Sequence, residues 1–357
     1  MGKKTIAVIF GGASSEHEIS IKSARTIIAN MDESKYTILP VFITTDGRWL
    51  LYDGSKDNLN PSSWEKYATS AILSPDTSHK GLLRLVGDKF KLIEIDAVFP
   101  VLHGKNGEDG TIQGLFELAG IPYVGSGVLG SSVAMCKAFT NMIAEGMGIK
   151  QVDFLTITKS EMETNLEEVL KKIRYQIGYP CFVKPSNTGS SVGVTMAKDK
   201  KSLLKSLEEA AFYDDLIVVE KRAVGRELEC SVLGNEDAIA SGVGEITFQR
   251  EFYCYDAKYD CEGSQTIVPA DVPAEIVKEI QEQSLKIFHG LNCKGLARVD
   301  FFLTEDGQVL FNEINTMPGF TNISMYPMLW HEQGMTTTDI VDKLIELALE
   351  GRDDAGE

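Results

Sequence analysis

The sequence predicts an α/β protein of two or three domains that opens with an α/β layer and carries paired acids near its C-terminal end. At 357 residues, a prior of about 150 residues per domain gives two or three domains. The apolar run Thr5–Phe10 leads through two glycines into a helix, as at the start of an open α/β layer, where ligands bind outside the carboxyl ends of strands. Near the other end, two apolar runs of strand length flank an Asp-Gly turn signal.

Composition narrows the class of protein. The chain is 43% hydrophobic and 24% charged, which is ordinary for a soluble protein with a sizeable core. A formal net charge of −17 argues against a nucleic-acid or anionic-membrane surface, so any phosphate site must be local. The six scattered cysteines include no CxxC pair and favour a reducing compartment. With no cleavage signal and no apolar run near the roughly 20 residues of a membrane span, we expect a cytoplasmic protein.

Two more strands are expected in the first domain, at residues 36–44 and 96–102. Residues 46–88 between them are polar and weakly patterned, and we interpret them as an excursion on this domain. The loop at 103–110 holds three glycines, which permit close approach of backbone to a ligand. After a helix of period 3.6, the glycine-rich residues 123–132 are a candidate domain junction.

Two polar residues follow these strands. Glu16 lies in the first helical turn, where the helix dipole favours an acid, so a capping role and a functional role both remain open. His103 begins the glycine loop and is either a satisfied structural group or a substrate contact.

A second unit begins with a strand at residues 151–157 and an amphipathic helix. The strand at 181–184 then enters a glycine- and serine-rich loop, residues 185–193, and a further strand follows. Flexible N–H and hydroxyl donors can fold over phosphate oxygens, although the loop is not a Walker A motif. The alternative is a mobile surface hairpin.

The strand Leu216–Lys221 ends in Glu220 and Lys221. An acid beside a base suits the amino group and ring nitrogens of adenine, and an ion pair at a domain hinge is the rival interpretation. Strands at 227–233 and 238–248 precede residues 249–269, a long aromatic loop of the kind that usually forms a lid or binding loop.

Helices are expected at 274–291 and 337–349, on either side of the C-terminal hairpin. In that hairpin, Leu296–Leu303 and Val309–Ile314 flank the turn, and Asp306-Gly307 predicts a two-residue type I′ turn.

The predicted register places Asp300 opposite Glu313 and Arg298 opposite Asn315, all on one face. Directly opposed carboxylates, with Cβ atoms about 5 Å apart, repel each other, so such a pair persists if a cation lies between them or if one acid stays protonated. Carboxylate and amide oxygens suit Mg²⁺. The alternative is a solvated polar face, but the apolar residues beside the acids favour a covered sheet. We therefore expect a metal site.

Seven segments together resemble the D-alanine–D-alanine ligases, a family of ATP-grasp enzymes, in the family's order: GGASSEHEIS, LHGKNGEDG, VKPSNTGSSVG, VVEK, YDAKY, ARVDFF and FNEINTMPGFT. The resemblance covers nearly the whole chain. It implies an α/β (α+β) three-domain ATP-grasp fold, whose N-terminal domain is an open parallel-sheet α/β unit. The implied divisions are an N-terminal domain at 1–136, a central subdomain at 137–222, a C-terminal subdomain at 223–350 and a polar tail at 351–357.

The resemblance also implies a reaction. The carboxylate of one D-alanine attacks the γ-phosphate of ATP, and the amine of a second D-alanine then displaces phosphate from the acyl phosphate. Positioning and cationic clamping would supply most of the catalysis. The implied requirements are ATP, D-alanine and two Mg²⁺ (or Mn²⁺) ions, with a weak expectation of a homodimer and a role in building peptidoglycan precursors.

Site residues are implied at the positions that match the family's motifs. The metal ligands would be Asp300, Glu313 and Asn315. The nucleotide contacts would be Lys137, Lys184, Ser190, Ser191, Glu220, Lys221, Ala223 and Glu227. The substrate and catalytic contacts would be Glu16, His103, Ser190, Lys258, Tyr259, Arg298, Gly319 and Ser324. One departure is Cys136, because the family commonly has an acid before the central lysine.

Roles within the last group are also implied. Glu16 would hold the first ammonium and share a hydrogen-bonded triad with Ser190 and Tyr259. Lys258 and Ser324 would receive the second carboxylate. Arg298 and the backbone of Gly319 would stabilise the tetrahedral oxyanion, and His103 would lie beside the first subsite.

Three alternatives remain. Enzymes of the resistance type join D-alanine to D-lactate or D-serine, but the D-lactate enzymes lack the Lys258–Tyr259 pair found here, and the D-serine enzymes tend to carry arginine where this chain has Met325. An ATP-binding regulatory module would usually have lost a ligand. A nicotinamide oxidoreductase is disfavoured because the dinucleotide fingerprint is absent.

Overall fold

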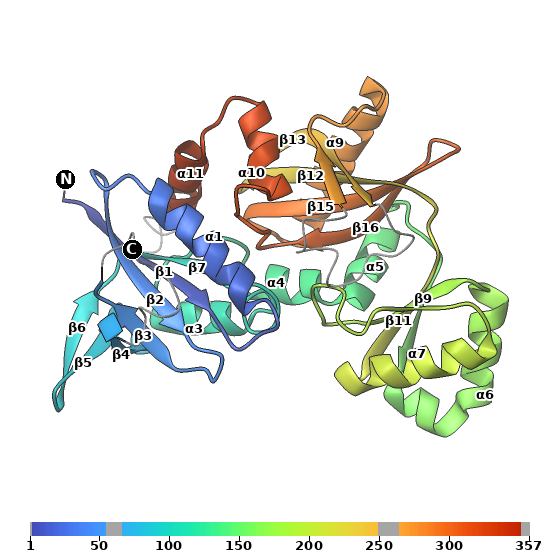
Figure 1. The fold of residues 1–357 in the computed structure, drawn as a ribbon, viewed down its shortest axis with the longest axis horizontal. Helices are drawn as coiled ribbons and strands as arrows, with labels where there is room; N and C mark the ends of the chain where they lie inside the picture. Colours follow the sequence, from blue (N-terminus) through green and yellow to red (C-terminus); the bar gives the residue numbers. More distant parts are fainter. Residues whose placement is uncertain (1, 55–65, 249–263, 351–357) are drawn as a thin grey trace.

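The computed structural model describes residues 2–54, 66–248 and 264–350 (Figure 1). Within these ranges the strands form three sheets, of seven, four and five strands, which follow one another along the chain. The N-terminal sheet lies at one end of the molecule, and helices α4 (Val128–Met135) and α5 (Lys137–Gly146) run from it towards the other two sheets.

The N-terminal sheet has a parallel half built from the predicted apolar strands. β1 (Lys4–Gly11) pairs in parallel with β2 (Tyr36–Ile43) on one side and with β7 (Ala97–Val101) on the other. Nearly every residue of β1 and β7 is buried, because helices cover both faces. This burial is why the three strands read as continuous apolar runs in the sequence.

The interpretation of residues 46–88 as an excursion is wrong. In the described part, these residues and those just after them extend the same sheet by four antiparallel strands: β3 (Trp49–Tyr52), β4 (Ala68–Leu73), β5 (Gly81–Val86) and β6 (Lys89–Glu94). The sequence hides them because the outer strands bury little side-chain surface, and all but one residue of β6 is exposed.

Helices from both ends of the chain cover this sheet. One face packs against α1 (His17–Asn30) and α11 (Thr337–Glu350), and the other against α3 (Thr111–Ala119). Ile340, Val341 and Leu344 of α11 are fully buried in the same apolar cluster as Ile6 and Val8 of β1. The C-terminal helix therefore completes the N-terminal layer.

The central sheet has the order β10-β9-β11-β8 and is covered by two helices. Its strands are β8 (Phe154–Thr158), β9 (Cys181–Pro185), β10 (Thr195–Ala197) and β11 (Leu216–Lys221). Its helices are α6 (Lys159–Gln176) and α7 (Lys200–Tyr213). Sequence reasoning did not predict α7, although Asp199 and Ser202 form a capping box at its start.

The C-terminal sheet has the order β14-β13-β12-β15-β16. Its strands are β12 (Gly225–Gly234), β13 (Ile239–Phe248), β14 (Ser264–Ile267), β15 (Gly295–Thr304) and β16 (Val309–Asn315). Helix α9 (Ala274–Gly290) packs on one face, and α10 (Met325–Glu332) lies against the other side of β12 and β13. Helix α10 was not predicted.

The C-terminal hairpin has the predicted register at the acids but not the predicted turn. Asp300 pairs with Glu313 and Arg298 with Asn315. At the turn, however, Thr304 rather than Glu305 faces Gln308, so the loop has three residues and only Gly307 has positive φ. A type I′ turn would need positive φ at Asp306 as well.

A one-residue bulge restores the register. The pairing shifts between Asp300 and Phe301, because Phe301 faces Phe311 and one residue of β16 is left over before Glu313. The longer loop and the bulge cancel each other, so the prediction of the opposed acids is confirmed although its premise about the turn is wrong.

In the described ranges, no helix combines the length and apolar character needed to cross a membrane. Cys136, Cys181, Cys230 and Cys293 are buried free thiols. Burial raises the pKa of Cys181 and Cys230 to about 11 and that of Cys293 to about 12, which keeps these thiols protonated.

Candidate active site

A cleft of about 1260 Å³ lies where the three sheets meet. Its lining includes α1, the glycine loop after β7, the start of α5, and the exposed faces of the central and C-terminal sheets. Every residue that the sequence analysis selected for a site and that the structure describes lines this cleft.

Glu16 lies at the start of α1 but does not cap the helix with its side chain. Its carboxylate instead accepts a hydrogen bond from the Ser190 hydroxyl, which belongs to the loop between β9 and β10. This contact brings two members of the expected triad together. The third, Tyr259, lies outside the described residues.

Two glycines make room for the Glu16 carboxylate. Gly104 has φ +71°, and a Cβ there would clash with Glu16 Oε2. A Cβ on Gly189 would lie 2.9 Å from the same oxygen. The close approach of the two glycine backbones therefore needs residues without side chains.

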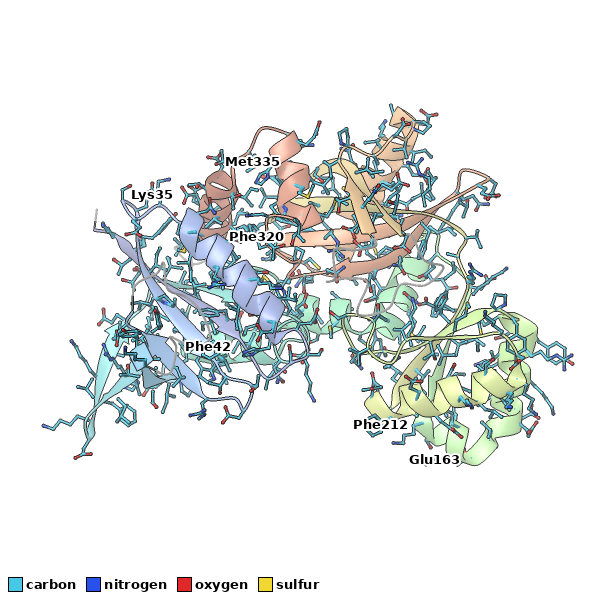
Figure 2. All side chains as sticks on the ribbon, in the orientation of Figure 1. Lys35, Phe42, Glu163, Phe212, Phe320 and Met335 are labelled. Carbon is cyan, nitrogen blue, oxygen red and sulfur yellow. The ribbon has the colours of Figure 1, made fainter. Side chains whose placement is uncertain are left out.

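His103 is a satisfied buried group, which favours the structural interpretation. Its Nδ1 lies 2.9 Å from the carbonyl oxygen of Met317 and must donate, because a carbonyl only accepts. Burial lowers the pKa of His103, so the ring is neutral and Nε2 accepts from the Ser23 hydroxyl at 3.1 Å. The N–H of Phe320 donates in turn to Ser23 Oγ. Figure 2 shows Phe320 beside α1.

Glu108 is a site residue that sequence reasoning missed. Its two carboxylate oxygens accept hydrogen bonds from the N–H groups of Gly104 at 2.7 Å and Met317 at 3.0 Å. Burial and the nearby charge of Glu16 raise the pKa of Glu108 to about 8, despite these donors. With His103, Glu108 ties the segment after β16 to the N-terminal domain. Its place in a GEDG run beside His103 was the only available signal.

The loop between β9 and β10 contains two residues in the left-handed backbone conformation. Ser190 (φ +49°) and Ser191 (φ +58°) are consecutive non-glycine residues in the left-handed region, an arrangement that costs energy and recurs at functional sites. The Lys137 ammonium donates to the carbonyl of Thr188 at 2.7 Å. Lys137 thus reaches this loop from the start of α5, as a phosphate-binding site would require.

A buried ion pair lies at the foot of the same loop. Lys184 Nζ is 2.5 Å from Glu220 Oε2, and the Asn141 amide donates to Glu220 Oε1 at 3.1 Å. Burial disfavours the Lys184 ammonium, but the charge and hydrogen bond of Glu220 outweigh it and hold the pKa of Lys184 above its ordinary value. The charges of Glu313 and Glu227 act in the same direction, which connects this pair electrostatically to the acids on the C-terminal sheet.

Glu220 and Lys221 do not pair with each other. The side chain of Lys221 is exposed and lies 3.4 Å from Asp153 at the surface, while Glu220 points inward. The rival interpretation, an ion pair between Glu220 and Lys221 at a domain hinge, is therefore wrong, because the base that pairs with Glu220 is Lys184. Lys221 and Ala223 still line the cleft, and so does Glu227.

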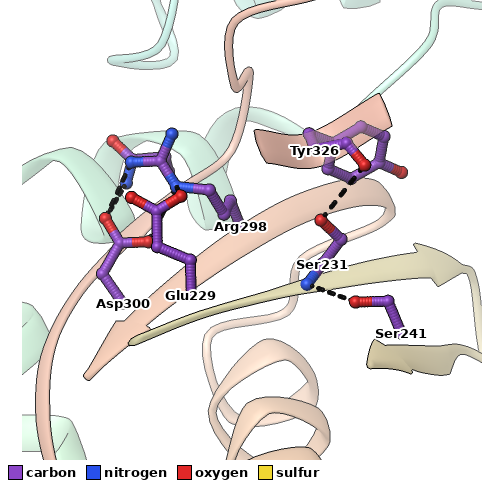
Figure 3. A network of polar contacts seen from close by, with 7 residues as sticks. Glu229, Ser231, Ser241, Arg298, Asp300 and Tyr326 are labelled. Atoms are coloured by element: carbon purple, nitrogen blue, oxygen red, sulfur yellow. Dashed lines mark hydrogen bonds and ion pairs between the residues drawn. The ribbon is translucent and has the colours of Figure 1, made fainter. Parts of the chain in front are cut away.

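Three acids form a row across three neighbouring strands of the C-terminal sheet. Glu229 of β12 lies opposite Asp300 of β15, which lies opposite Glu313 of β16. Arg298 joins the first two: its Nε and Nη2 donate to the Asp300 oxygens at 2.8 Å each, and its Nε is 3.0 Å from Glu229 Oε2 (Figure 3). Asn315 also donates to Asp300, at 3.1 Å. Sequence reasoning missed Glu229, because the pairing of β12 with β15 cannot be read from the sequence.

The donor set fits a divalent cation of the magnesium type. Asp300 and Glu313 present opposed carboxylates to the cleft, with the Asn315 amide next to them, and these are hard oxygen donors. Across residues 2–54, 66–248 and 264–350, no group of three His, Cys, Asp or Glu residues is close enough to form a metal cluster. The expected set has two acids and one amide, so phosphate oxygens and water would complete the shell.

The far wall of the cleft carries the residues expected around the second substrate. The Ser324 hydroxyl lies 2.8 Å from that of Thr321, within a turn that precedes α10. A Cβ on Gly319 would lie 3.0 Å from Ser324 Oγ. Met325 is 3% exposed, and its thioether packs closely on Gly244 of β13. Lys258 lies outside the described residues.

Comparisons with known proteins agree with this architecture. Residues 5–126 match the family described as D-ala D-ala ligase N-terminus, and residues 143–346 match D-ala D-ala ligase C-terminus. D-alanine–D-alanine ligases of Caldicellulosiruptor bescii and Acetivibrio thermocellus are 48% and 49% identical to this chain. These alignments cover 98% and 99% of this chain and 96% and 97% of those proteins.

Solved structures are also similar. The VanG D-Ala:D-Ser ligase of Enterococcus faecalis has a TM-score of 0.89 at 39% identity, covering 97% of this chain and 100% of that one. The D-alanine–D-alanine ligase of Coxiella burnetii has a TM-score of 0.85 at 37% identity, covering 99% of this chain and 97% of that one.

Proposed function

The chain belongs to the D-alanine–D-alanine ligase family, and from that premise we propose which of its residues carry out the ATP-dependent joining of two D-alanines. One observation carries the proposal: the Arg298–Asp300–Glu313 face opens into the same cleft as Lys137, Lys184 and the Glu16–Ser190 contact. A phosphoryl donor and two amino acids can therefore meet in one place.

ATP would lie between the central and C-terminal sheets. Lys137 and Lys184 would contact the phosphates, and the loop containing Ser190 and Ser191 would fold over them with its N–H groups. Glu220, held by Lys184 and Asn141, would accept a hydrogen bond from the adenine amino group. Lys221 and Ala223 would lie at the same edge of the base, and Glu227 at the ribose.

Asp300, Glu313 and Asn315 would hold two Mg²⁺ (or Mn²⁺) ions. These ions would neutralise the charge that gathers on the phosphate oxygens as the acyl phosphate forms. The side chains would fix the position of the triphosphate, because they project from paired strands of one sheet.

Glu16 would bind the ammonium of the first D-alanine, since its carboxylate faces the cleft between two glycines. Lys258 and Ser324 would receive the carboxylate of the second D-alanine. When its amine attacks the acyl phosphate, the Arg298 guanidinium and the N–H of Gly319 would donate to the developing oxyanion. Phosphate then leaves, and the attacking amine loses a proton as it becomes the amide.

D-serine is the competing second substrate, because the VanG enzyme is structurally similar. The observation that favours D-alanine is the packing of Met325, whose apolar side chain gives a serine hydroxyl no partner. An unpaired buried hydroxyl costs about 1–3 kcal/mol. We further propose that the enzyme works in the cytoplasm as a homodimer with the domain limits stated from the sequence.

Phosphate release tests this proposal. The purified chain, incubated with ATP and Mg²⁺, should release phosphate only when D-alanine is added, and L-alanine should not replace it. Phosphate release that does not depend on D-alanine would refute the assignment of the two amino-acid subsites.

A further inference from the structure

The Asp300 carboxylate would have to bind two groups, the Arg298 guanidinium and a metal ion. Both of its oxygens accept from the Arg298 guanidinium at 2.8 Å, and Oδ2 also accepts from Asn315. Under the proposed function the same carboxylate holds a divalent cation, which repels the guanidinium. If Asp300 were the only acid that holds Arg298, metal binding would release the guanidinium before it could donate to the oxyanion.

Glu229 can supply the second anchor. Its carboxylate is 6% exposed, lies directly opposite Asp300 on the neighbouring strand, and has Oε2 3.0 Å from Arg298 Nε. A buried carboxylate without a cationic partner would be costly, so its position indicates a lasting pairing with the guanidinium. Figure 3 shows the Arg298 side chain reaching over the neighbouring carboxylates of Glu229 and Asp300.

The charge balance supports this role. Glu229, Asp300 and Glu313 carry three negative charges against the single positive charge of Arg298. Under the proposed function, metal ions at Asp300 and Glu313 would engage those two acids, and Glu229 would remain to balance the charge of Arg298. Without Glu229, the positive charges of the metal and of the Arg298 guanidinium would repel each other, and no second carboxylate would hold the guanidinium in place.

We propose that Glu229 is the positioning residue that holds the Arg298 guanidinium towards the cleft when Asp300 binds the metal. This inference rests on the proposed function, but it concerns a residue for which the family resemblance implies no role. The next residue on the same face, Ser231, is fully buried and hydrogen bonds to the carbonyl of Tyr326, so it serves packing instead.

Glu229→Gln tests the proposal, with Glu245→Gln as a matched control. Glu245 is equally buried, lies on the next strand and pairs with a different arginine, Arg226, at 2.6 and 2.8 Å. If losing the ion pair with Arg298 costs as much as losing a charge-assisted hydrogen bond, kcat should fall about ten- to a hundredfold for Glu229→Gln, with the KM for ATP changed less than about threefold. Glu245→Gln should leave kcat within about threefold of the native value.

A double-mutant cycle with Arg298→Lys separates positioning from folding. Glu229→Gln should reduce kcat much less in the Arg298→Lys background, because the geometry that it protects is already lost. Equal effects in both backgrounds, or equal effects of Glu229→Gln and Glu245→Gln, would overturn the proposal. Since these outcomes leave phosphate release dependent on D-alanine, they would not refute the proposed function.

The NMR signal of the Arg298 side chain tests the proposal without measuring enzyme activity. In the ¹⁵N-arginine-labelled chain, the Arg298 Nε–H signal, assigned by its loss in Arg298→Lys, should stay sharp on adding ADP and Mg²⁺. In Glu229→Gln it should broaden on the same addition. If that variant does not fold, Glu229→Asp serves instead, with a smaller loss of kcat and partial broadening. An unchanged signal in a folded variant would contradict the proposal.

Discussion

Replacing Gly104 by alanine should displace the Glu16 carboxylate and weaken the first D-alanine subsite selectively. Two costs arise at this position. Gly104 has φ +71°, a region that costs an alanine roughly 1–2 kcal/mol. The added Cβ would also clash with Glu16 Oε2, and the Gly189 backbone lies close on another side of this oxygen, because a Cβ built on Gly189 would be only 2.9 Å from it.

Gly148→Ala is the matched control. Gly148 has φ +70°, nearly the same as Gly104, but a Cβ there would meet no heavy atom within 4 Å. Both variants should therefore lose similar stability in a urea melt from the backbone alone. Only Gly104→Ala should also move Glu16 away from Ser190.

The kinetic consequence can be estimated. If displaced Glu16 loses its charge-assisted bond to the substrate ammonium, about 1.5–3 kcal/mol is lost, or roughly tenfold to more than a hundredfold in KM for the first D-alanine. The KM for ATP should change little, because Lys137 and Lys184 lie elsewhere in the cleft. Steady-state kinetics at saturating ATP would measure both constants. If Gly104→Ala and Gly148→Ala have the same KM for D-alanine, the assignment of Glu16 to the first subsite is wrong.

Three further predictions follow from the site. Glu313→Gln should abolish turnover but leave the thermal melt intact, since the hairpin loses repulsion as well as a ligand; near-normal activity with Mg²⁺ would contradict the metal site. Lys258→Ala should weaken the second D-alanine by roughly tenfold to more than a hundredfold and the first much less, and equal losses at both subsites in initial-rate kinetics would count against this role. For Glu108, a pKa of about 8 in the folded chain, above that of an ordinary carboxyl group, means that folding favours its neutral form. The stabilising effect of that proton is present below the ordinary carboxyl pKa of 4.5 and is lost as pH rises from there to about 8. The stability of Glu108→Gln relative to the native chain should therefore rise between pH 5 and pH 9 by up to a few kcal/mol. A pH-independent difference in urea melts would show that Glu108 titrates normally.

The hairpin shows how far sequence reasoning reached. Apolar runs correctly located β15 and β16, and the opposed acids at Asp300 and Glu313 were predicted. The turn type was wrong, and the bulge that compensates for it could not be foreseen, because a bulge depends on how the strands pack and not on a residue pattern.

Other parts of the site depend on contacts between distant segments. Glu229 acquires its partner only when β12 pairs with β15, some seventy positions later in the chain, as the Glu229–Asp300 pairing shows. His103 and Glu108 both hydrogen bond to the backbone of Met317, which lies more than two hundred positions later in the chain. A single sequence marks such residues as polar side chains in loops or strands, but it does not say what they contact.

The most direct test of the account is the identity of the product formed from competing substrates. The purified chain would be supplied with ATP, Mg²⁺ and equal concentrations of D-alanine, D-serine and D-lactate, and the products would be identified by mass spectrometry. The account predicts D-alanyl-D-alanine as the main product, with one ADP and one phosphate per dipeptide. A main product that contains D-serine or D-lactate would contradict the assignment of the second subsite, and ATP hydrolysis without any ligated product would contradict the proposed mechanism.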